Sequence, residues 1–574
     1  MRTFIILACL LFPHSALAAN ATGQVFLDSN KNGVLDTAEQ GIEGVRVSNG
    51  LDVVTTDEEG RYTLPVDDQS IIFITKPRDH AIPVNAHMLP QFYYIHQPGG
   101  SPAGMRYEGI APTGPLPEQI NFPLIKREES EQFEAILFAD PQPQTQRELD
   151  YIRDDVVAEL IGTDAAFGMT MGDIMYDDLS LFPRYNALIA QIGIPWYNVP
   201  GNHELNFEAE SDKFSLETFK RFFGPPYYAF EYADALFIVL DNIDYQGNGE
   251  ADPGDVRGNG GYEARISKQQ LRWLEKELEY VDNDRLVFVA THAPLGSEDR
   301  RYTTDNRKGL FRLLAGRPNL YSVAGHTHTT NHIYFGEEDG FDGPGTFHHH
   351  VLATVSGSWW SGPFDERGIA ISDQRDGTPN GYHILEVDST DLTVRFKGAG
   401  KPADQQMRIR FDVAHHQLQP NGIRDFKAGQ LLDGHLSQDE LGDFKAGQLL
   451  DGHLSQDELA AASIMVNLFD GGPKSVVTYR VNDGEYQPLT RTLRKDPYML
   501  EQFVRHASDK KSFVQATVST HIFEADLSAD LPPGVHTVTV RAEDEFGRVH
   551  HGHTVLEIVP GVAGSEAGLD YPSP

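Results

Sequence analysis

The sequence predicts a layered α/β domain, in which a β-sandwich is flanked by helices, with one β-sandwich-type domain before it and another after it. Strand-like and helix-like segments alternate between residues 129 and 355, which is the pattern of layered α/β folds. Short β-type segments separated by turn residues fill residues 20–128 and 356–560, as in small sandwiches. The length of 574 residues fits roughly three or four domains.

The start of the chain has the features of an export signal. Arg2 supplies a short positive region, residues 4–12 are apolar, and Ala16, Leu17 and Ala18 form a small-x-small cleavage pattern. We therefore predict that residues 1–18 are a signal peptide. The apolar segment is too short to span a bilayer, and we expect no membrane span elsewhere. Since the only cysteine, Cys9, lies in this segment, we expect a bacterial periplasmic or secreted protein without disulfides.

The charge balance is strongly acidic. The chain has 84 Asp and Glu residues against 47 Lys and Arg residues, a formal net charge of -37. This field argues against a nucleic-acid groove and against binding to an anionic membrane surface. A phosphorylated substrate would also be repelled, so it would require a local cation at its binding site.

The first domain is predicted to be a small antiparallel sandwich. Its β-type segments are residues 25–27, 44–47, 53–55 and 61–66, and the Pro- and Gly-rich residues 77–117 look like an irregular extension or linker.

An EF-hand-like pattern lies between the first two of these segments. The candidate calcium ligands are Asp28, Asn30, Asn32, Val34 through its carbonyl, Asp36 and Glu39. Gly33 stands at the sixth position of the pattern, where the loop turns sharply. Because strands rather than helices flank it, the segment resembles the calcium loops in B-type repeats of bacterial surface proteins. A structural calcium and a plain Asn-Gly turn are the two interpretations of this loop.

The middle domain alternates strands and helices. The predicted strands are residues 133–138, 165–171, 194–199, 235–240, 285–290 and 321–324. The predicted helices are residues 147–161, 179–192 and a helix that opens with a capping-box pattern at Ser267 and Gln270 and continues to about residue 280.

Metal-type side chains follow five of these predicted strands. In chain order they are Asp140 and Gln142; Asp173; Asn202 and His203; His292; and His326 and His328. In layered α/β sheets ligands bind beyond the carboxyl ends of the strands, so we expect these side chains to share one edge. A donor set of carboxylates, imidazoles and amides suits Zn, Mn, Fe, Co or Ni better than calcium.

This series resembles the calcineurin-like metallophosphoesterase superfamily, whose motifs are D-x-H, G-D, G-N-H-[DE], H and G-H-x-H. The resemblance covers residues 135–330. It implies two metals: Asp173 bridges them, Asp140 and His328 hold the first, and Asn202, His292 and His326 hold the second. It further implies that His203 is the proton donor, or a clamp on the transition-state oxyanion. The implied reaction is in-line attack on a phosphoester by a metal-bridging hydroxide.

The sequence departs from the family pattern at one ligand. The family's first motif has histidine where this chain has Gln142. Purple acid phosphatases also lack that histidine and use the tyrosine of a G-D-x-x-Y motif, which Tyr176 matches here. Gln142 and Tyr176 are therefore alternative ligands of the first metal.

The last part of the chain is predicted to be β-rich. Trp359 and Trp360 belong either to a domain interface or to an aromatic wall that contacts the leaving group. With residues 376–382, they resemble the C-terminal domain of secreted bacterial calcineurin-like phosphoesterases, which also carry a small N-terminal β domain.

A tandem duplication interrupts this part. Residues 425–441 recur identically at 443–459, and we expect the 18-residue duplication at 425–459 to lie in a surface loop. Ser455 and Glu458 form a capping-box pattern at the start of a short helix. The predicted strands are residues 464–467, 475–481, 535–541 and 553–559, and residues 561–574 are expected to be a disordered tail.

Two functional hypotheses follow. The first is an exported dinuclear phosphoesterase that hydrolyses phosphomonoesters or phosphodiesters of small molecules. The second is a cell-surface, calcium-stabilised binding protein with a decayed phosphoesterase site. Two transition metals per chain would favour the enzyme, and calcium alone would favour the binding protein.

Overall fold

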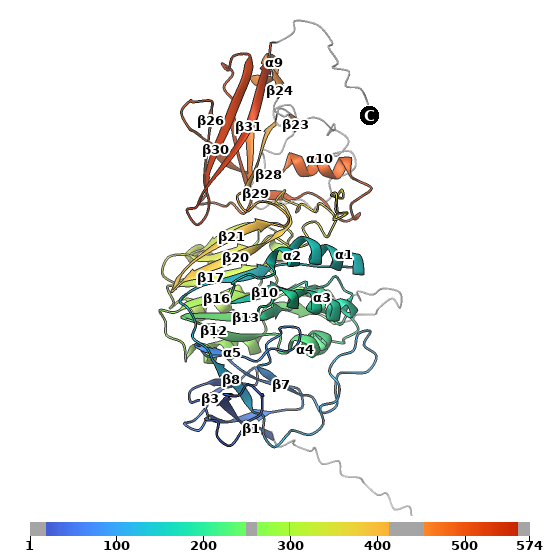
Figure 1. Ribbon diagram of the computed structural model, residues 1–574, viewed down its shortest axis with the longest axis vertical. Coiled ribbons are helices and arrows are strands. Elements are labelled where there is room, and N and C mark those ends of the chain that lie inside the picture. The colour runs from blue at the N-terminus through green and yellow to red at the C-terminus, as the bar shows by residue number, and fades with distance from the viewer. Residues whose placement is uncertain (1–18, 248–260, 298, 413–448, 451–452, 561–574) are drawn as a thin grey trace, which may run out of the picture.

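The computed structural model describes residues 19–247, 261–297, 299–412, 449–450 and 453–560. The predicted signal peptide, the first repeat copy and the predicted tail lie outside these residues. Three parts are stacked along the long axis of the molecule, with the N-terminal module at one end, the α/β core in the middle and the C-terminal sandwich at the other end (Figure 1). In the part of the chain that is described, no helix has the length and apolar character needed to cross a membrane.

The N-terminal module is a sandwich of two four-stranded sheets, ordered β4-β1-β8-β6 and β3-β2-β5-β7. Its strands are β1 (Ala19–Leu27), β2 (Arg46–Ser48), β3 (Val53–Thr55), β4 (Arg61–Val66), β5 (Ser70–Ile74), β6 (His80–Ala81), β7 (Tyr93–His96) and β8 (Phe122–Lys126). The predicted sandwich is confirmed, but two details are wrong. Strands β1 and β8 pair in parallel, and the predicted linker at 77–117 contains β7, which pairs with β5.

The core packs a five-stranded sheet, β11-β10-β9-β20-β21, with a six-stranded sheet, β12-β13-β16-β17-β19-β18. Its strands are β9 (Gln132–Phe138), β10 (Phe167–Met171), β11 (Trp196–Val199), β12 (Tyr228–Tyr232), β13 (Ala235–Val239), β16 (Leu286–Ala290), β17 (Leu320–Ala324), β18 (Asn331–Phe335), β19 (Phe347–Val351), β20 (Gly381–Asp388) and β21 (Asp391–Gly398), with the separate hairpin β14 (Ile243–Tyr245) and β15 (Tyr262–Ala264). Each predicted core strand is confirmed with small shifts at its ends. Every residue of β10, β13 and β16 is buried, as expected for strands covered on both faces.

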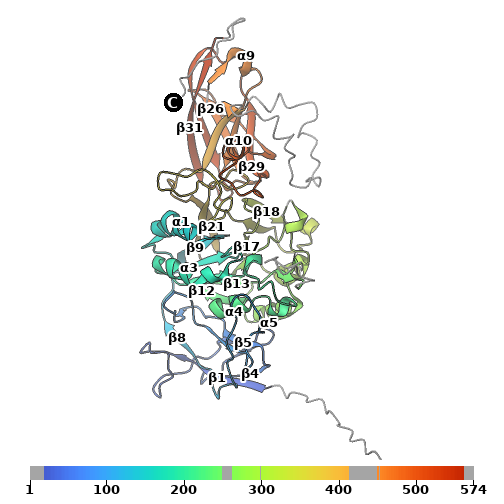
Figure 2. The ribbon, with the colours of Figure 1, turned by 90° about the vertical axis from the view of Figure 1, so that its right-hand side faces the viewer.

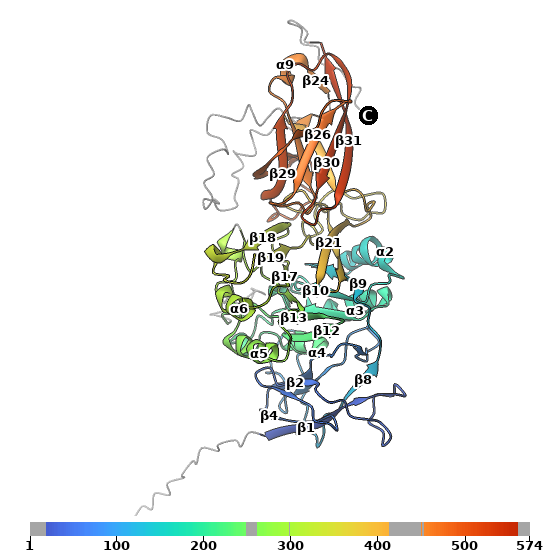
Figure 3. The same cartoon turned by 90° about the vertical axis from the view of Figure 1, so that its left-hand side faces the viewer.

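Helices flank both sides of this sandwich, with α5 and α6 on one side and α2 and α3 on the other (Figure 3). The helices are α1 (Gln146–Tyr151), η1 (Ile152–Val157), α2 (Ala158–Leu160), η2 (Leu179–Leu181), α3 (Phe182–Ile189), η3 (Ala190–Ile192), η4 (Asn202–Glu204), η5 (Asp212–Phe214), α4 (Glu217–Phe223), α5 (Lys268–Leu278), η6 (Arg300–Tyr302), α6 (Arg307–Leu314) and η7 (Glu337–Asp339). The predicted helix at 147–161 is continuous from α1 to α2, with a π-helical middle.

The capping box predicted at the start of α5 is only half formed. The Ser267 hydroxyl accepts from the Gln270 amide at 3.2 Å. The Gln270 side chain instead accepts from the Asp241 amide at 3.0 Å and donates to the Asp241 carbonyl at 2.8 Å. Gln270 therefore connects the first turn of α5 to the segment just after β13 by two hydrogen bonds.

Strands β20 and β21 complete the five-stranded sheet, since β20 pairs with β9 over residues 383–388. These strands come from the segment that we assigned to the C-terminal domain. In structural terms the core thus continues past residue 356 to the end of β21.

The C-terminal sandwich contains sheets ordered β23-β22-β25-β29-β28 and β24-β31-β30-β26-β27. Its elements are β22 (Met407–Asp412), β23 (Leu449–Leu450), β24 (His453–Ser455), α9 (Gln456–Leu459), β25 (Ser463–Leu468), β26 (Val476–Val481), β27 (Gln487–Pro488), β28 (Thr490–Lys495), α10 (Pro497–Arg505), β29 (Val518–Asp526), β30 (Gly534–Glu543) and β31 (Val549–Val559). The four predicted strands and the complete capping box of α9 are confirmed.

Candidate metal centre

The predicted metal-type residues lie together beyond the carboxyl ends of strands from both core sheets. Strands β9, β10 and β11 run parallel in one sheet, and β16 and β17 run parallel in the other. Each is followed directly by one of the predicted motifs. The sequence-based prediction of one shared edge is therefore matched by the arrangement of the chain.

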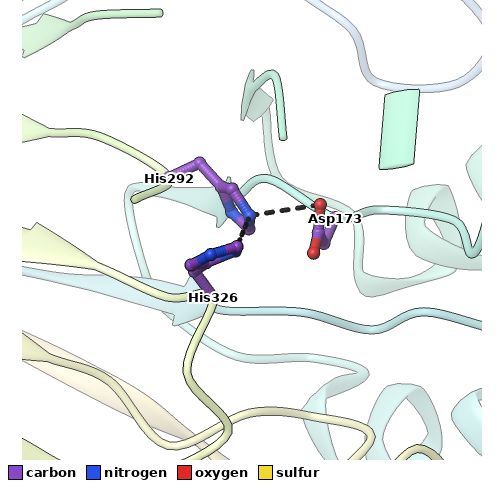
Figure 4. Close-up of side chains that lie close together, drawn as sticks. All are labelled: Asp173, His292 and His326. Carbon is purple, nitrogen blue, oxygen red and sulfur yellow. Dashed lines mark hydrogen bonds and ion pairs between the residues drawn. The ribbon is translucent and has the colours of Figure 1, made fainter. Parts of the chain in front are cut away.

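One group of donor atoms surrounds the imidazole of His292 (Figure 4). Its Nε2 lies 3.1 Å from Oδ1 of Asp173, 3.1 Å from Oδ1 of Asn202 and 3.0 Å from Nδ1 of His326. The other ring nitrogen, Nδ1, lies 2.8 Å from the Met171 carbonyl, to which it must donate.

This arrangement fits a cation. Nδ1 of His292 donates to the Met171 carbonyl, so Nε2 faces the other lone-pair-bearing atoms. Burial acts to lower the pKa of His292, but Asp173 outweighs it and raises this pKa to about 9, so the position attracts positive charge. Such a cluster of acceptors is repulsive unless a positive charge lies among them. Histidines that bind metals commonly donate their second N–H to a backbone carbonyl, as His292 does.

A second group contains Asp140, Gln142 and His328, all buried. The Gln142 amide donates to Oδ2 of Asp173 at 2.9 Å, and Nε2 of His328 lies 3.7 Å from Oδ1 of Asp140. Within the described residues, Oε1 of Gln142 and Nε2 of His328 have no hydrogen-bond partner. Because such buried polar atoms are nearly always satisfied, the two atoms fit a first metal held with Asp140 and Asp173.

The backbone of the ligand loops is strained. Asp140, Gln142, Asp173, His326 and His328 all have φ between 38° and 76°. This left-handed region is sparsely populated by non-glycine residues, and strain of this kind clusters at functional sites.

Two motif glycines leave space for the ligands. A Cβ at position 325 would lie 2.2 Å from Oδ2 of Asp140, and one at position 201 would lie 2.2 Å from the backbone nitrogen of Asp173. Only glycine permits these approaches.

The buried carboxylates differ in their electrostatics. Burial raises the pKa of Asp140, because the protein around it compensates its charge poorly. Burial acts in the same direction on Asp173, but the imidazoles of His292 and His203 outweigh it and hold the pKa of Asp173 below its usual value. A cation beside Asp140 would remove the cost of burying its charge.

His203 is held between two carboxylates. Its backbone amide donates to Oδ1 of Asp173 at 3.0 Å, and its Nδ1 lies 2.6 Å from Oδ1 of Asp177. Burial acts to lower the pKa of His203, but Asp173 and Asp177 outweigh it and raise the pKa. Asp177 was not among the residues predicted from the sequence, where it carries no motif signal.

Glu204 connects two of the ligand loops. Its carboxylate accepts from the backbone amides of Met175 at 3.0 Å and Gly201 at 2.8 Å. Although the G-N-H-E motif contains this residue, the sequence did not indicate which groups it would bind.

An arc of aromatic rings joins the two sides of the site. Tyr176 stacks on His203, with ring centroids 4.4 Å apart, and Phe513 stacks on Tyr176 at 6.2 Å. Phe513 also meets Trp359 edge-on at 5.3 Å, and Trp359 stacks on His328 at 3.6 Å. Phe513 lies just after α10 of the C-terminal sandwich and is 50% exposed. No motif in the sequence points to Phe513, because it lies far from all of them.

Trp360 is placed differently from Trp359. Its side chain is buried, its Nε1 donates to the Pro141 carbonyl at 2.9 Å, and its ring packs against Tyr151. Trp360 therefore holds the loop after β9 in place, and only Trp359 belongs to the arc of aromatic rings.

The predicted calcium loop folds around its polar residues. The amides of Asn30 and Asn32 both donate to Oδ2 of Asp36, at 2.7 and 3.0 Å. Asp28 accepts from the backbone amides of Asn32 and Gly33. The side chain of Glu39 accepts from the backbone amides of Ser29 and Asp36, which closes the loop. The predicted ligand atom of Val34 is its backbone carbonyl, and its side chain is exposed.

A two-sheet α/β sandwich whose strand ends gather these carboxylates, imidazoles and amides has the architecture of a metallophosphoesterase. Family models for calcineurin-like phosphoesterase match the chain in order: the N-terminal domain over residues 29–109, the phosphoesterase core over 137–330 and the C-terminal domain over 349–550. The chain belongs to the calcineurin-like phosphoesterase family.

No curated protein matches the chain. Among solved structures, the chain is similar to the purple acid phosphatase PPD1 from yellow lupin (Lupinus luteus) seeds, with 13% identity and a TM-score of 0.34. The alignment covers 66% of this chain and 66% of that chain, just under two thirds of each. The family assignment rests on the family models.

Proposed function

We propose that this protein is an exported phosphoesterase that uses two transition metals to hydrolyse a small phosphorylated substrate. The main support is the group of lone-pair-bearing atoms around Nε2 of His292, which lie 3.0–3.1 Å from it. The buried, unpartnered atoms of Gln142 and His328 support a metal at the first site as well, beside the one at His292. Export is supported by the predicted signal sequence alone.

Two divalent or mixed-valence ions, of Mn, Fe, Zn, Co or Ni, would supply Lewis acidity and lower the pKa of a water molecule. In this proposal Asp173 lies between the two sites. Asp140, Gln142 and His328 belong to the first site, and Asn202, His292 and His326 to the second. Gln142 is favoured over Tyr176 as the first-site ligand, because its amide contacts Asp173 while the ring of Tyr176 stacks on His203.

His203 would handle the proton in this reaction. Its Nε2 lies 3.9 Å from Oδ2 of Asp173 and therefore faces the centre, while its Nδ1 faces Asp177. A proton held on His203 can be donated to the leaving oxygen or hydrogen-bonded to a developing oxyanion. Asp177 would orient the ring and stabilise its protonated form.

The aromatic arc would contact the leaving group. Trp359 and Tyr176 present ring faces beside His328 and His203, with Phe513 between them. Tyr262 and Tyr302 lie against His326. Aromatic side chains favour planar or apolar groups. We therefore propose an ester whose alcohol carries an aromatic or otherwise apolar group.

The alternative is a calcium-stabilised binding protein with a decayed phosphoesterase site. A decayed site would be expected to lose its strained ligand backbone and its unpartnered buried donors, yet both are present here. Calcium at the loop of Asp28 and Asp36 is compatible with either function, and its proposed role is structural.

The experiment compares wild type with Asn202→Ala and His326→Ala on a chromogenic phosphoester and on a panel of monoesters and diesters. We expect both variants to remain folded by circular dichroism and to lose hydrolysis. Metal analysis should give about two transition-metal ions per chain at this centre in the wild type and fewer in the variants. Full hydrolysis by a folded variant, or calcium as the only bound metal, would refute the proposed enzyme.

A further inference from the structure

A second group of histidines lies where the core meets the C-terminal sandwich. His332 of β18, His350 of β19 and His383 of β20 place their Nε2 atoms near one carboxylate oxygen, Oδ1 of Asp470. The distances from that oxygen are 3.5, 2.7 and 3.3 Å, respectively. Asp470 lies just after β25, so both sheets of the core and the C-terminal sandwich contribute to this group. In Figure 2, β18 lies beside the C-terminal sandwich.

The strand register brings two of the histidines together. His332 and His350 are directly opposite each other in the antiparallel pair β18 and β19. Their side chains therefore lie on the same face of the sheet, with ring centroids 3.9 Å apart. The donor atoms of His332, His350 and Asp470 all lie within 4.8 Å of one another.

All four side chains are buried, with residue exposures of 7% or less. Burying a carboxylate among imidazoles costs free energy unless its charge is compensated. Asp470 also has a left-handed backbone, with φ of 60°. Backbone strain at a buried, charged residue is common where a site constrains the side chain.

Hydrogen bonds alone do not account for this group. His350 donates well to Asp470, at 2.7 Å, and Nε2 of His332 lies 3.1 Å from the Asp470 carbonyl. Neither nitrogen of His383 has a hydrogen-bond partner in the described part of the chain, although its ring is completely buried. An unsatisfied buried polar group costs about 1–3 kcal/mol, and a cation beside Asp470 would provide His383 with a partner.

The surroundings suit metal ligation through Nε2. Nδ1 of His350 lies 2.9 Å from the hydroxyl of Tyr321, and Nδ1 of His332 lies 2.9 Å from Nε2 of His348. Metal-binding histidines commonly have their second ring nitrogen held in this way, which fixes the orientation of the ring. The resulting set of three imidazoles and one carboxylate matches the donors and the coordination number that Zn²⁺ prefers.

We propose that His332, His350, His383 and Asp470 bind one divalent transition-metal ion, with Zn²⁺ the best fit, and that this ion fastens the C-terminal sandwich to the core. None of these residues belongs to the phosphoesterase centre, so the site is independent of the proposed function. The free energy of binding would add to the stability of the domain junction. The same C-terminal sandwich contributes Phe513 to the arc of aromatic rings beside the proposed metal centre.

The test measures zinc per chain in the full-length protein after loading with Zn²⁺ and removal of free metal. His350→Ala should lose about one zinc per chain relative to wild type, because it removes the ligand closest to Asp470. His349→Gln is the matched control, since it changes a buried histidine on the same strand that contacts Ser322 and Leu295 instead. His326→Ala should lose zinc from the phosphoesterase centre and keep this one.

A second measurement does not depend on the folding of a variant. Crystals of zinc-loaded wild type should show an anomalous peak among the four side chains, with ligand distances of about 2.0–2.1 Å. A zinc content that is unchanged in folded His350→Ala overturns the proposal. The absence of a peak at Asp470 in zinc-loaded wild type also overturns it and would leave a hydrogen-bonded cluster only.

Discussion

Nδ1 of His203 lies 2.6 Å from Oδ1 of Asp177. Tyr176, from the same loop, stacks on the His203 ring, with ring centroids 4.4 Å apart. The loop after β10 therefore supplies Asp173, the carboxylate proposed to lie between the two metals, and also fixes the ring of His203 that faces it. Asp177 is a positioning residue in this arrangement, because it acts through His203.

We predict that Asp177→Asn lowers kcat while leaving metal content unchanged. The neutral amide lacks the negative charge that stabilises the protonated imidazole, and we expect a loss of roughly 10- to 100-fold, by analogy with residues that orient metal-binding histidines. His203→Ala should cost about 10²–10⁴-fold, the usual contribution of a general acid or base. Steady-state kinetics and metal analysis of the same preparations provide the measurement.

The double variant distinguishes positioning from an independent role. If Asp177 acts only through His203, the double variant should be no slower than His203→Ala alone. Additive losses would show that Asp177 contributes to catalysis by another route, and a loss of metal in Asp177→Asn would make it part of the metal site.

A second prediction concerns Gly325. In Gly325→Ala the added Cβ would lie 2.2 Å from Oδ2 of Asp140, so either the carboxylate or the loop must move. We expect metal content at the centre to fall, hydrolysis to fall by at least about 100-fold, and stability to decrease by about 1–3 kcal/mol, as for other overpacked sites.

Gly336→Ala is the matched control for this substitution. No atom lies within 4 Å of its added Cβ, and Gly336 follows β18 in the same core. Its activity and melting temperature should stay near those of wild type. Normal metal content in Gly325→Ala would show that the loop adapts and that the close approach is not required.

The strands, and the metal-type residues that lie together at their ends, could be predicted because their signals are local. Buried strands are short apolar runs, and each motif directly follows one of them. Asp177 and Phe513 carry no such signal, since their roles depend on contacts with residues distant in sequence. The same reason explains the unpredicted parallel pairing of β1 with β8 and the assignment of β20 and β21 to the core sheet. Pairing partners are determined by tertiary packing, which periodicity does not report.

A third prediction distinguishes the two alternative ligands of the first metal. Gln142→Ala should lower occupancy of that site, because it removes the buried, unpartnered Oε1. Gln142→His should raise metal affinity, since imidazole is a stronger ligand for transition metals than an amide. Tyr176→Phe should keep both metals, because its ring can still stack on His203. Loss of a metal, or of visible colour from an iron-loaded protein, in Tyr176→Phe would instead identify Tyr176 as the ligand.

A fourth prediction concerns the leaving group. Phe513→Ala should lower kcat/KM for esters of aromatic alcohols by roughly two- to tenfold, corresponding to about 0.5–1.5 kcal/mol for an aromatic contact. Esters of small aliphatic alcohols should be unaffected, and Phe513 is half exposed, so little stability should be lost. An equal loss for both classes of ester would mean that Phe513 holds Tyr176 and Trp359 in position and does not determine substrate specificity.

The last prediction concerns the duplication. In the structure, the end of the second copy forms β24 and α9, with Leu454 and Leu459 completely buried in the C-terminal sandwich. Deleting residues 425–442 leaves an identical copy directly before Ala460, so the same strand and helix can form. We expect activity and melting temperature to remain near the wild-type values.

The control for the deletion is Leu459→Ala, which should destabilise the sandwich by about 2–5 kcal/mol because it empties a buried site. Thermal unfolding and hydrolysis of the chromogenic ester, measured on both variants, provide the comparison. If the deletion unfolds the protein as strongly as Leu459→Ala does, the first copy is part of the folded domain. If the deletion is folded but inactive, the first copy contributes to function instead, and either result contradicts its assignment to a dispensable surface loop.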